Sequence, residues 1–159
     1  MSRQWTLYFY ALATLVVGIL VYVIDRPADD VYFLRIASRY MEGSYGQLHD
    51  SLPSFLHALA FSLAMIGAVT ARTPGTIAQI CGAWWLLEGL LEVIQSDSVG
   101  GGLSQLLPAG ITSVPFLEAL PSYMAAGTFD VADLIAAGFG CTLAFFTGIS
   151  LRKPTCAQY

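Results

Sequence analysis

The stretch WWLLEGLLEVIQ, residues 84–95, is almost entirely apolar, yet it contains the acidic residues Glu88 and Glu92. Residues four apart lie on one face of an α-helix, so the two carboxyl groups are expected to share a face. An apolar run of this kind predicts a helix inside a membrane, where an ionisable side chain costs roughly 3 kcal/mol and is a candidate for function. The two glutamates are therefore the first candidate site residues.

The composition of the whole chain also predicts a membrane protein. Of its 159 residues, 56% are hydrophobic and 11% are charged, and the mean hydropathy is +0.65. Soluble domains carry about 25% charged residues, so this chain has too few polar side chains to cover a water-exposed surface. The net charge of −4 and the lack of a basic cluster in the sequence argue against a nucleic-acid partner.

Four apolar segments are long enough to cross a bilayer as helices, which takes about 20 residues. They are residues 5–25, 52–71, 75–95 and 130–151. The first is too long for the hydrophobic region of a signal peptide, so we expect it to be retained. The predicted fold is an all-α polytopic membrane four-helix bundle, in which residues 1–159 form a single membrane domain.

The basic residues outside the two long loops predict the orientation. They lie at the N-terminus, between the second and third spans, and on the C-terminal tail: Arg3, Arg72, Arg152 and Lys153. Four spans put both termini on one side, and the positive-inside rule makes that side cytoplasmic. Residues 26–51 and 96–129 then become outer loops.

Both outer loops are expected to carry short helices at the membrane surface. The segment DDVYFLRIASRYMEG, residues 29–43, has apolar residues at helical spacing and predicts an amphipathic interfacial helix. The second loop is apolar, but Pro108, Pro115 and Pro121 interrupt it too often for a fifth spanning helix. We expect this loop to form a lid or a shallow re-entrant segment.

The polar residues of three spans are predicted to meet in the outer leaflet. The second span enters from outside, the third leaves towards outside, and the fourth begins outside, so their polar residues reach a similar depth. The predicted ligand-binding residues are His57, Glu88, Glu92, Gln95, Asp130 and Asp133. The inner halves of these spans contain almost no ionisable residues.

Small residues indicate which faces approach closely. His57 shares a face with Ala60, Ala64 and Ala68, and the fourth span carries a small residue at every fourth position. This ladder consists of Ala132, Ala136, Gly140, Ala144 and Gly148. Such spacing is typical of close helix packing within one chain, and it would serve equally well for a homo-oligomer or a larger membrane complex.

Several of these residues have a purely structural interpretation. His57 could be a hydrogen-bonding group between helices. Asp130 is well placed to be the N-cap of the fourth helix. Gln95 could be an interfacial end group. The cysteines Cys81 and Cys141 fall inside spans and are expected to be packing residues, since zinc-binding spacings are absent from the sequence.

Three short motifs resemble those of VanZ-like membrane proteins. LPSFLHALAFSLA, residues 52–64, resembles the His segment of that family, and LEVIQ, residues 91–95, its Glu-x-x-Gln signature. FDVADLIAAGFG, residues 129–140, resembles the Asp-containing element of the last helix. The residues at the motif positions are His57, Glu92, Gln95, Asp133 and Gly140.

The resemblance covers residues 50–151 and has defined departures. Ala137 stands where the family usually has Asn, Gly127 lies near the position of a family Arg, and Pro53 and Ser54 replace an Asp-Lys pair. The resemblance implies a four-helix protein of the bacterial envelope, here the plasma (inner) membrane. The family is associated with tolerance of glycopeptide antibiotics.

Three functions are compatible with these features. The favoured one is binding of a lipid or amphiphile headgroup in the acidic pocket, without a cofactor. The first alternative is an intramembrane hydrolase of a lipid-linked substrate, with His57, Glu88, Glu92 and Asp133 as candidate catalytic residues. A divalent metal could then take part, with His49 as a second imidazole ligand. The second alternative is a small accessory subunit of a membrane complex.

Overall fold

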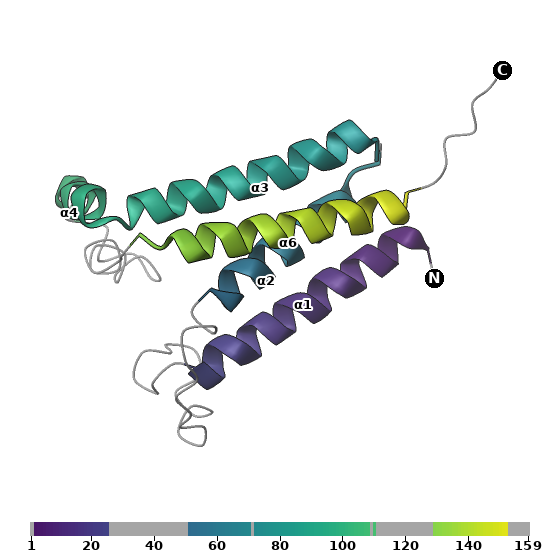
Figure 1. Ribbon diagram of the computed structural model, residues 1–159, viewed down its shortest axis with the longest axis horizontal. Helices are drawn as coiled ribbons and strands as arrows, with labels where there is room; N and C mark the ends of the chain where they lie inside the picture. The colour runs from purple at the N-terminus through teal and green to yellow at the C-terminus, as the bar shows by residue number, and fades with distance from the viewer. Residues whose placement is uncertain (1, 26–50, 71, 109, 111–128, 153–159) are drawn as a thin grey trace.

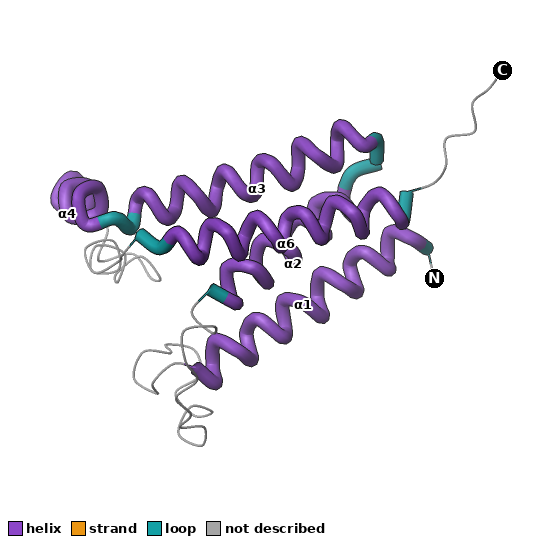
Figure 2. Tube along the Cα trace, in the orientation of Figure 1, coloured by secondary structure: helices purple, strands orange, loops and turns teal. Residues whose placement is uncertain are grey.

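The computed structural model describes residues 2–25, 51–70, 72–108, 110 and 129–152, and all regular secondary structure in these residues is helical (Figures 1 and 2). The described helices are α1 Arg3–Asp25, α2 Leu52–Ala68, α3 Pro74–Ile94, α4 Asp97–Leu106 and α6 Val131–Ser150. The all-α prediction is confirmed. The helix predicted within residues 29–43 lies outside the described residues.

Three of the described helices are long and apolar enough to cross a membrane. They are Arg3–Val21 within α1, Pro74–Ile94 and Val131–Ser150. The remaining predicted span, residues 52–71, is shorter than expected, because α2 ends at Ala68 and not at residue 71. Its 17 residues extend over roughly 25 Å at 1.5 Å per residue.

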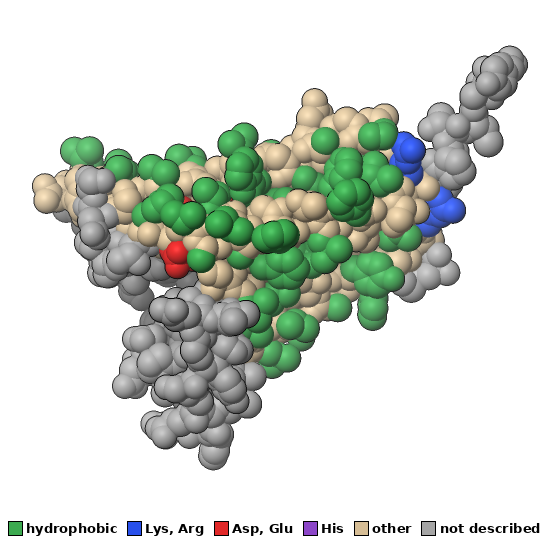
Figure 3. Space-filling model, viewed as in Figure 1, with side chains coloured by type: hydrophobic (Ala, Val, Ile, Leu, Met, Phe, Trp, Pro, Cys, Tyr) green, Lys and Arg blue, Asp and Glu red, His purple; other side chains and the backbone are tan. Residues whose placement is uncertain are grey.

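Large apolar side chains cover the outside of these helices. Leu86 is 69% exposed, Phe139 66% and Phe146 63%. Such side chains also spread over the face drawn in Figure 3. An apolar surface this extensive is unfavourable in water and suits the hydrocarbon of a bilayer. The protein therefore has the surface of a membrane protein.

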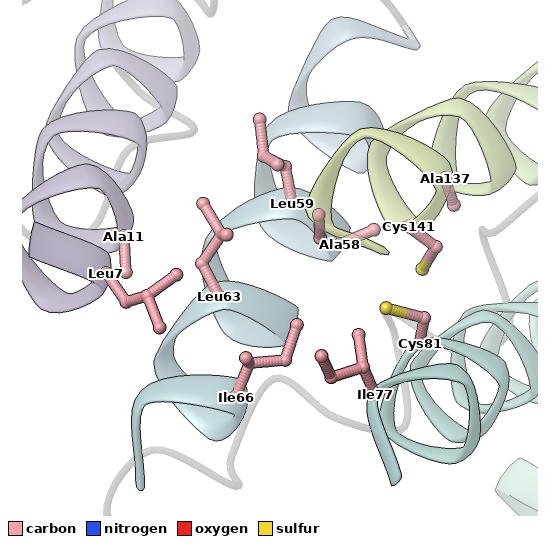
Figure 4. Close-up of a cluster of buried hydrophobic side chains, with 11 residues drawn as sticks. Leu7, Ala11, Ala58, Leu59, Leu63, Ile66, Ile77, Cys81, Ala137 and Cys141 are labelled. Carbon is pink, nitrogen blue, oxygen red and sulfur yellow. The ribbon is translucent and has the colours of Figure 1, made fainter. Parts of the chain in front are cut away.

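The core forms around α2, which packs against α1, α3 and α6, while α3 also packs against α6 (Figure 1). Figure 4 shows the buried side chains that these helices direct towards one another. The cluster consists of Leu7, Ala11, Ala58, Leu59, Leu63, Ile66, Ile77, Cys81, Ala137, Cys141 and Ala144. Cys81 and Cys141 belong to this core, which confirms their prediction as packing residues.

The predicted ladder on α6 is used for the contact with α2. A Cβ atom at Gly140 would collide with the backbone oxygen of Phe55 and lie 3.1 Å from the backbone nitrogen of Leu59. Further along, Ala144 and Gly148 are also buried. The inner part of the ladder therefore packs inside this chain. Its use by an external partner stays a prediction.

The turn between α2 and α3 is held by side-chain caps. Thr73 precedes α3 and accepts a hydrogen bond from the backbone nitrogen of Thr76 at 3.1 Å. Arg72 donates from Nε to the Ile66 oxygen at 2.9 Å and from Nη2 to the Gly67 oxygen at 3.0 Å. The two bonds from Arg72 satisfy carbonyl groups that the end of α2 leaves without helical partners. The guanidinium group thus closes α2 early.

The start of α1 and the end of α6 lie at the same end of the structure (Figure 1). Arg3 Nη1 donates to the backbone oxygen of Arg152 at 2.6 Å, which joins the start of α1 to the end of α6. Figure 3 shows basic side chains at this end and acidic ones towards the other. The separation of charges predicted for the described residues is therefore present in the fold.

We predict that Gly140→Ala destabilises the fold because its new methyl group must push the α2 backbone away from α6. Overpacking of this kind costs about 1–3 kcal/mol. Thermal unfolding in detergent, followed by helical circular dichroism, should show a lower midpoint. The matched control is Gly82→Ala, since a Cβ at Gly82 meets nothing within 4 Å. Equal stability of the two variants would contradict the close contact at Gly140.

Candidate functional site

The candidate site lies where the buried stripe of α3 changes from apolar to acidic. Ile77 and Cys81 are buried against the core, and the same stripe continues through Glu88 to Glu92. Glu92 is only 8% exposed, although it is a charged residue. Helical spacing thus carries the two glutamates onto the side of α3 that faces the other helices. The two carboxyl groups of the apolar stretch are therefore directed towards the other helices.

Glu92 ties the end of α3 to the start of α6. Its Oε2 accepts a hydrogen bond from the backbone nitrogen of Asp130 at 3.0 Å. Asp130 in turn is the N-cap of α6, because its Oδ1 accepts from the backbone nitrogen of Ala132 at 2.7 Å. The capping role considered for Asp130 is confirmed. Glu92 therefore has a structural partner as well as a place in the acidic cluster.

Glu88 is one helical turn before Glu92 on α3. It is half-buried and interacts electrostatically with both Glu92 and Asp133. Asp133 lies in the first turn of α6, and its Oδ1 is shielded from solvent. The positive end of a helix dipole favours a carboxylate at such a position. Glu88, Glu92 and Asp133 form the carboxyl cluster of this site.

His57 lies at the depth of the carboxyl cluster but is positioned by aromatic rings. Its ring centroid is 6.1 Å from that of Phe61, and Phe61 stacks on Trp84 at 4.9 Å. Since α2 and α3 are antiparallel, His57 is one turn before this stack and Glu88 one turn after it, at a similar level. Within the described residues no hydrogen bond joins His57 to Glu88 or Glu92. Among the predicted site residues that the structure describes, α3 and α6 are joined by the hydrogen bond from the Asp130 nitrogen to Glu92, and the meeting of all three helices stays a prediction.

The remaining predicted site residue, Gln95, is the C-cap of α3. Its backbone nitrogen donates to the oxygens of Leu91 at 3.0 Å and Glu92 at 3.2 Å. Its side chain is half-buried. The structure thus places Gln95 at the boundary of α3, beside the cluster in sequence and at the end of the helix.

Two contacts near the site were not predicted from the sequence. Trp85 Nε1 donates to the backbone oxygen of Leu134 at 3.1 Å, which braces α3 against α6. The hydroxyl group of Ser62 is buried 3.7 Å from the sulfur of Cys141. Gly138 was the available signal for the first contact, because a Cβ atom at this position would lie only 3.3 Å from Trp85 Nε1. The pairing itself depends on helix register, which a sequence pattern does not define.

The described arginines lie away from the carboxyl cluster. Arg72 bonds the last turn of α2, and Arg3 and Arg152 are joined at the same end of the structure. Arg26, Arg35, Arg39 and His49 lie outside the described residues. In the part of the chain that is described, no three His, Cys, Asp or Glu residues are arranged to hold a metal ion. Neighbouring carboxylates repel one another, and a proton or a cation bound at such a site would relieve the repulsion.

No protein-family model matches this chain, and no curated protein or solved structure matches it either.

We predict that Glu92→Leu destabilises the fold while Glu92→Gln does so much less. Leucine leaves the backbone nitrogen of Asp130 without its acceptor, and an intramolecular hydrogen bond of this kind contributes about 1 kcal/mol. Glutamine keeps an oxygen at this position and removes only the charge. Thermal unfolding in detergent without added lipid measures both. If the two variants unfold alike, the hydrogen bond to Asp130 does not hold α3 to α6.

Proposed function

We propose that this protein is an integral protein of the bacterial plasma membrane that binds the amine-bearing headgroup of a lipid or amphiphile. The observation that supports the proposal is that Glu88 and Glu92 lie near the end of α3 and Asp133 in the first turn of α6, where Glu92 is hydrogen-bonded to Asp130. Carboxyl groups in a membrane are costly. A bound ammonium group would offset that cost by supplying the opposite charge.

In this proposal α1, α2, α3 and α6 all cross the membrane as a four-helix bundle with both termini in the cytoplasm. Arg3, Arg72, Arg152 and the adjacent Lys153 support this orientation through the positive-inside rule. The carboxyl cluster then lies in the outer leaflet, just below the headgroups. The shorter α2 fits such a bundle if the bilayer thins locally or flanking side chains extend to the interface.

The residues of the carboxyl cluster would have different roles in binding. Glu88 and Asp133 would accept hydrogen bonds from the ammonium group, while one oxygen of Glu92 remains with the Asp130 nitrogen. Hydrogen bonds between charged groups are about twice as strong as neutral ones. His57 and Gln95, at the edge of the site, would orient the rest of the headgroup, and the outer loops would cover it.

We also propose that the chain is a divergent VanZ-like protein. His57, Glu92, Gln95 and Asp133, the polar residues at its motif positions, belong to the acidic half of the structure. The fifth motif residue, Gly140, is where α2 and α6 are in closest contact. A glycine there has a physical reason, because any side chain would separate the two helices. The motif would thus combine a helix crossing with the polar site that depends on it.

The proposal predicts that the double variant Glu88→Gln/Asp133→Asn loses selectivity for amine headgroups. Native mass spectrometry of protein from nanodiscs would compare retained phosphatidylethanolamine with retained phosphatidylglycerol. We expect the preference for phosphatidylethanolamine to fall about tenfold, the equivalent of one charged hydrogen bond. The control Arg152→Gln changes one charge at the opposite end and should keep the preference. A wild-type protein without any preference for the amine lipid would refute the proposal.

A further inference from the structure

A groove runs along the outside of the structure between α3 and α6. Its volume is about 540 Å³, within the range of roughly 300–1,000 Å³ typical of small-molecule sites. It is lined by Ala78, Cys81, Gly82, Trp85, Ile135, Gly138, Phe139, Cys141, Thr142, Phe145 and Phe146. Phe139 and Phe146 are exposed, so the groove opens sideways, where the bilayer would lie.

The groove offers apolar and aromatic contacts and few polar ones. The hydroxyl group of Thr142 donates to the backbone oxygen of Gly138 at 2.8 Å, one turn earlier in α6. The indole nitrogen of Trp85 donates to the Leu134 oxygen. Both polar side chains of the lining thus have partners inside the protein. A hydrocarbon chain matches such a surface better than water or a polar ligand does.

The groove begins at the carboxyl cluster. Its wall on α3 includes Cys81 and Trp85. Glu88 follows on the same side of that helix, three residues after Trp85. A molecule whose headgroup is bound by the carboxyl cluster would therefore have its chain at the entrance of this groove.

The length of the groove matches one leaflet. Its lining on α6 runs from Ile135 to Phe146, which is about 16 Å at 1.5 Å per residue. The hydrocarbon core of a bilayer is about 30 Å thick, so one leaflet contributes about half of that. A second groove, between α2 and α3, contains Trp84 and Thr76 and has no wall on α6, the helix that carries Asp133. It provides a natural control.

We propose that the groove between α3 and α6 holds an acyl chain of the same lipid whose amine headgroup is bound by the carboxyl cluster. This inference rests on the proposed function and extends it from the headgroup to the whole lipid. The ligand class is a membrane lipid with an amine headgroup and at least one long chain. Trp85 would lie along the chain, held in place by its bond to α6.

Tryptophan quenching tests the proposal, because the chain has three tryptophans and only Trp85 lines this groove. Trp5→Phe/Trp84→Phe leaves Trp85 as the only fluorophore, and Trp5→Phe/Trp85→Phe leaves Trp84 in the other groove. Both proteins are placed in phosphatidylcholine nanodiscs with a low mole fraction of phosphatidylethanolamine brominated on its acyl chains. We expect stronger quenching of Trp85 than of Trp84, relieved by unbrominated phosphatidylethanolamine but not by phosphatidylglycerol.

Gly82→Leu then blocks the groove without disturbing the fold, since a Cβ at Gly82 meets nothing within 4 Å. In the protein that keeps only Trp85, Gly82→Leu should raise the lipid concentration for half-maximal quenching about tenfold, the effect of losing a few buried methylene contacts. The matched control Ala83→Leu adds the same side chain on the neighbouring position, in the other groove, and should change nothing.

A short-chain phosphatidylethanolamine, too short to fill the groove, separates the two proposals. Gly82→Leu should still retain it in native mass spectrometry, whereas Glu88→Gln/Asp133→Asn should lose it. If the short lipid binds but Trp85 is quenched no more than Trp84, the groove proposal is wrong and the headgroup proposal stands. If the wild type retains no short amine lipid, the proposed function fails, and the acyl-chain proposal fails with it. Cross-linking of two copies through Gly82→Cys would instead assign the groove to a second protein chain.

Discussion

The close contact between α2 and α6 at Gly140 is the constraint on which the other helix positions depend. The Phe55 backbone lies where a Cβ would be, so the two helices can approach this closely only because α6 has no side chain at this point. The contact makes α2 the central helix and leaves α1 and α3 to pack around it. Small residues at helix crossings have this effect in membranes, where van der Waals packing replaces the hydrophobic drive to associate.

The acidic site follows from this arrangement because α3 must pack against both α2 and α6. The stripe of α3 that contacts them is apolar at Ile77 and Cys81 and acidic at Glu88 and Glu92. Packing of the apolar half of the stripe therefore determines where the carboxyl groups of the acidic half point. The hydrogen bond from the Asp130 nitrogen to Glu92 joins the two helices at that level. The core and the site are two ends of one interface.

Much of the fold could be predicted because helix period and apolar length are local properties. The all-α class, the cysteine packing and the Asp130 cap all depend on residues close in sequence. The end of α2 could not be predicted in this way, since Arg72 folds back onto the carbonyl groups of Ile66 and Gly67. Likewise, the hydrogen bond between Trp85 and Leu134 depends on the axial position of α3 relative to α6. Helix register of this kind is decided by tertiary packing.

The same distinction explains why the acidic residues were found but their partners were not. An ionisable residue in an apolar helix is visible in the sequence, whereas its neighbours on another helix are not. Depth could be calculated for His57 from the direction of α2, yet its ring is positioned by Phe61 and, through it, by Trp84. Depth alone does not bring two side chains into contact, because rotation of each helix about its axis is a separate variable. For α3 and α6 the packing between the two helices sets this rotation, and there the carboxylate of Glu92 meets the backbone nitrogen of Asp130.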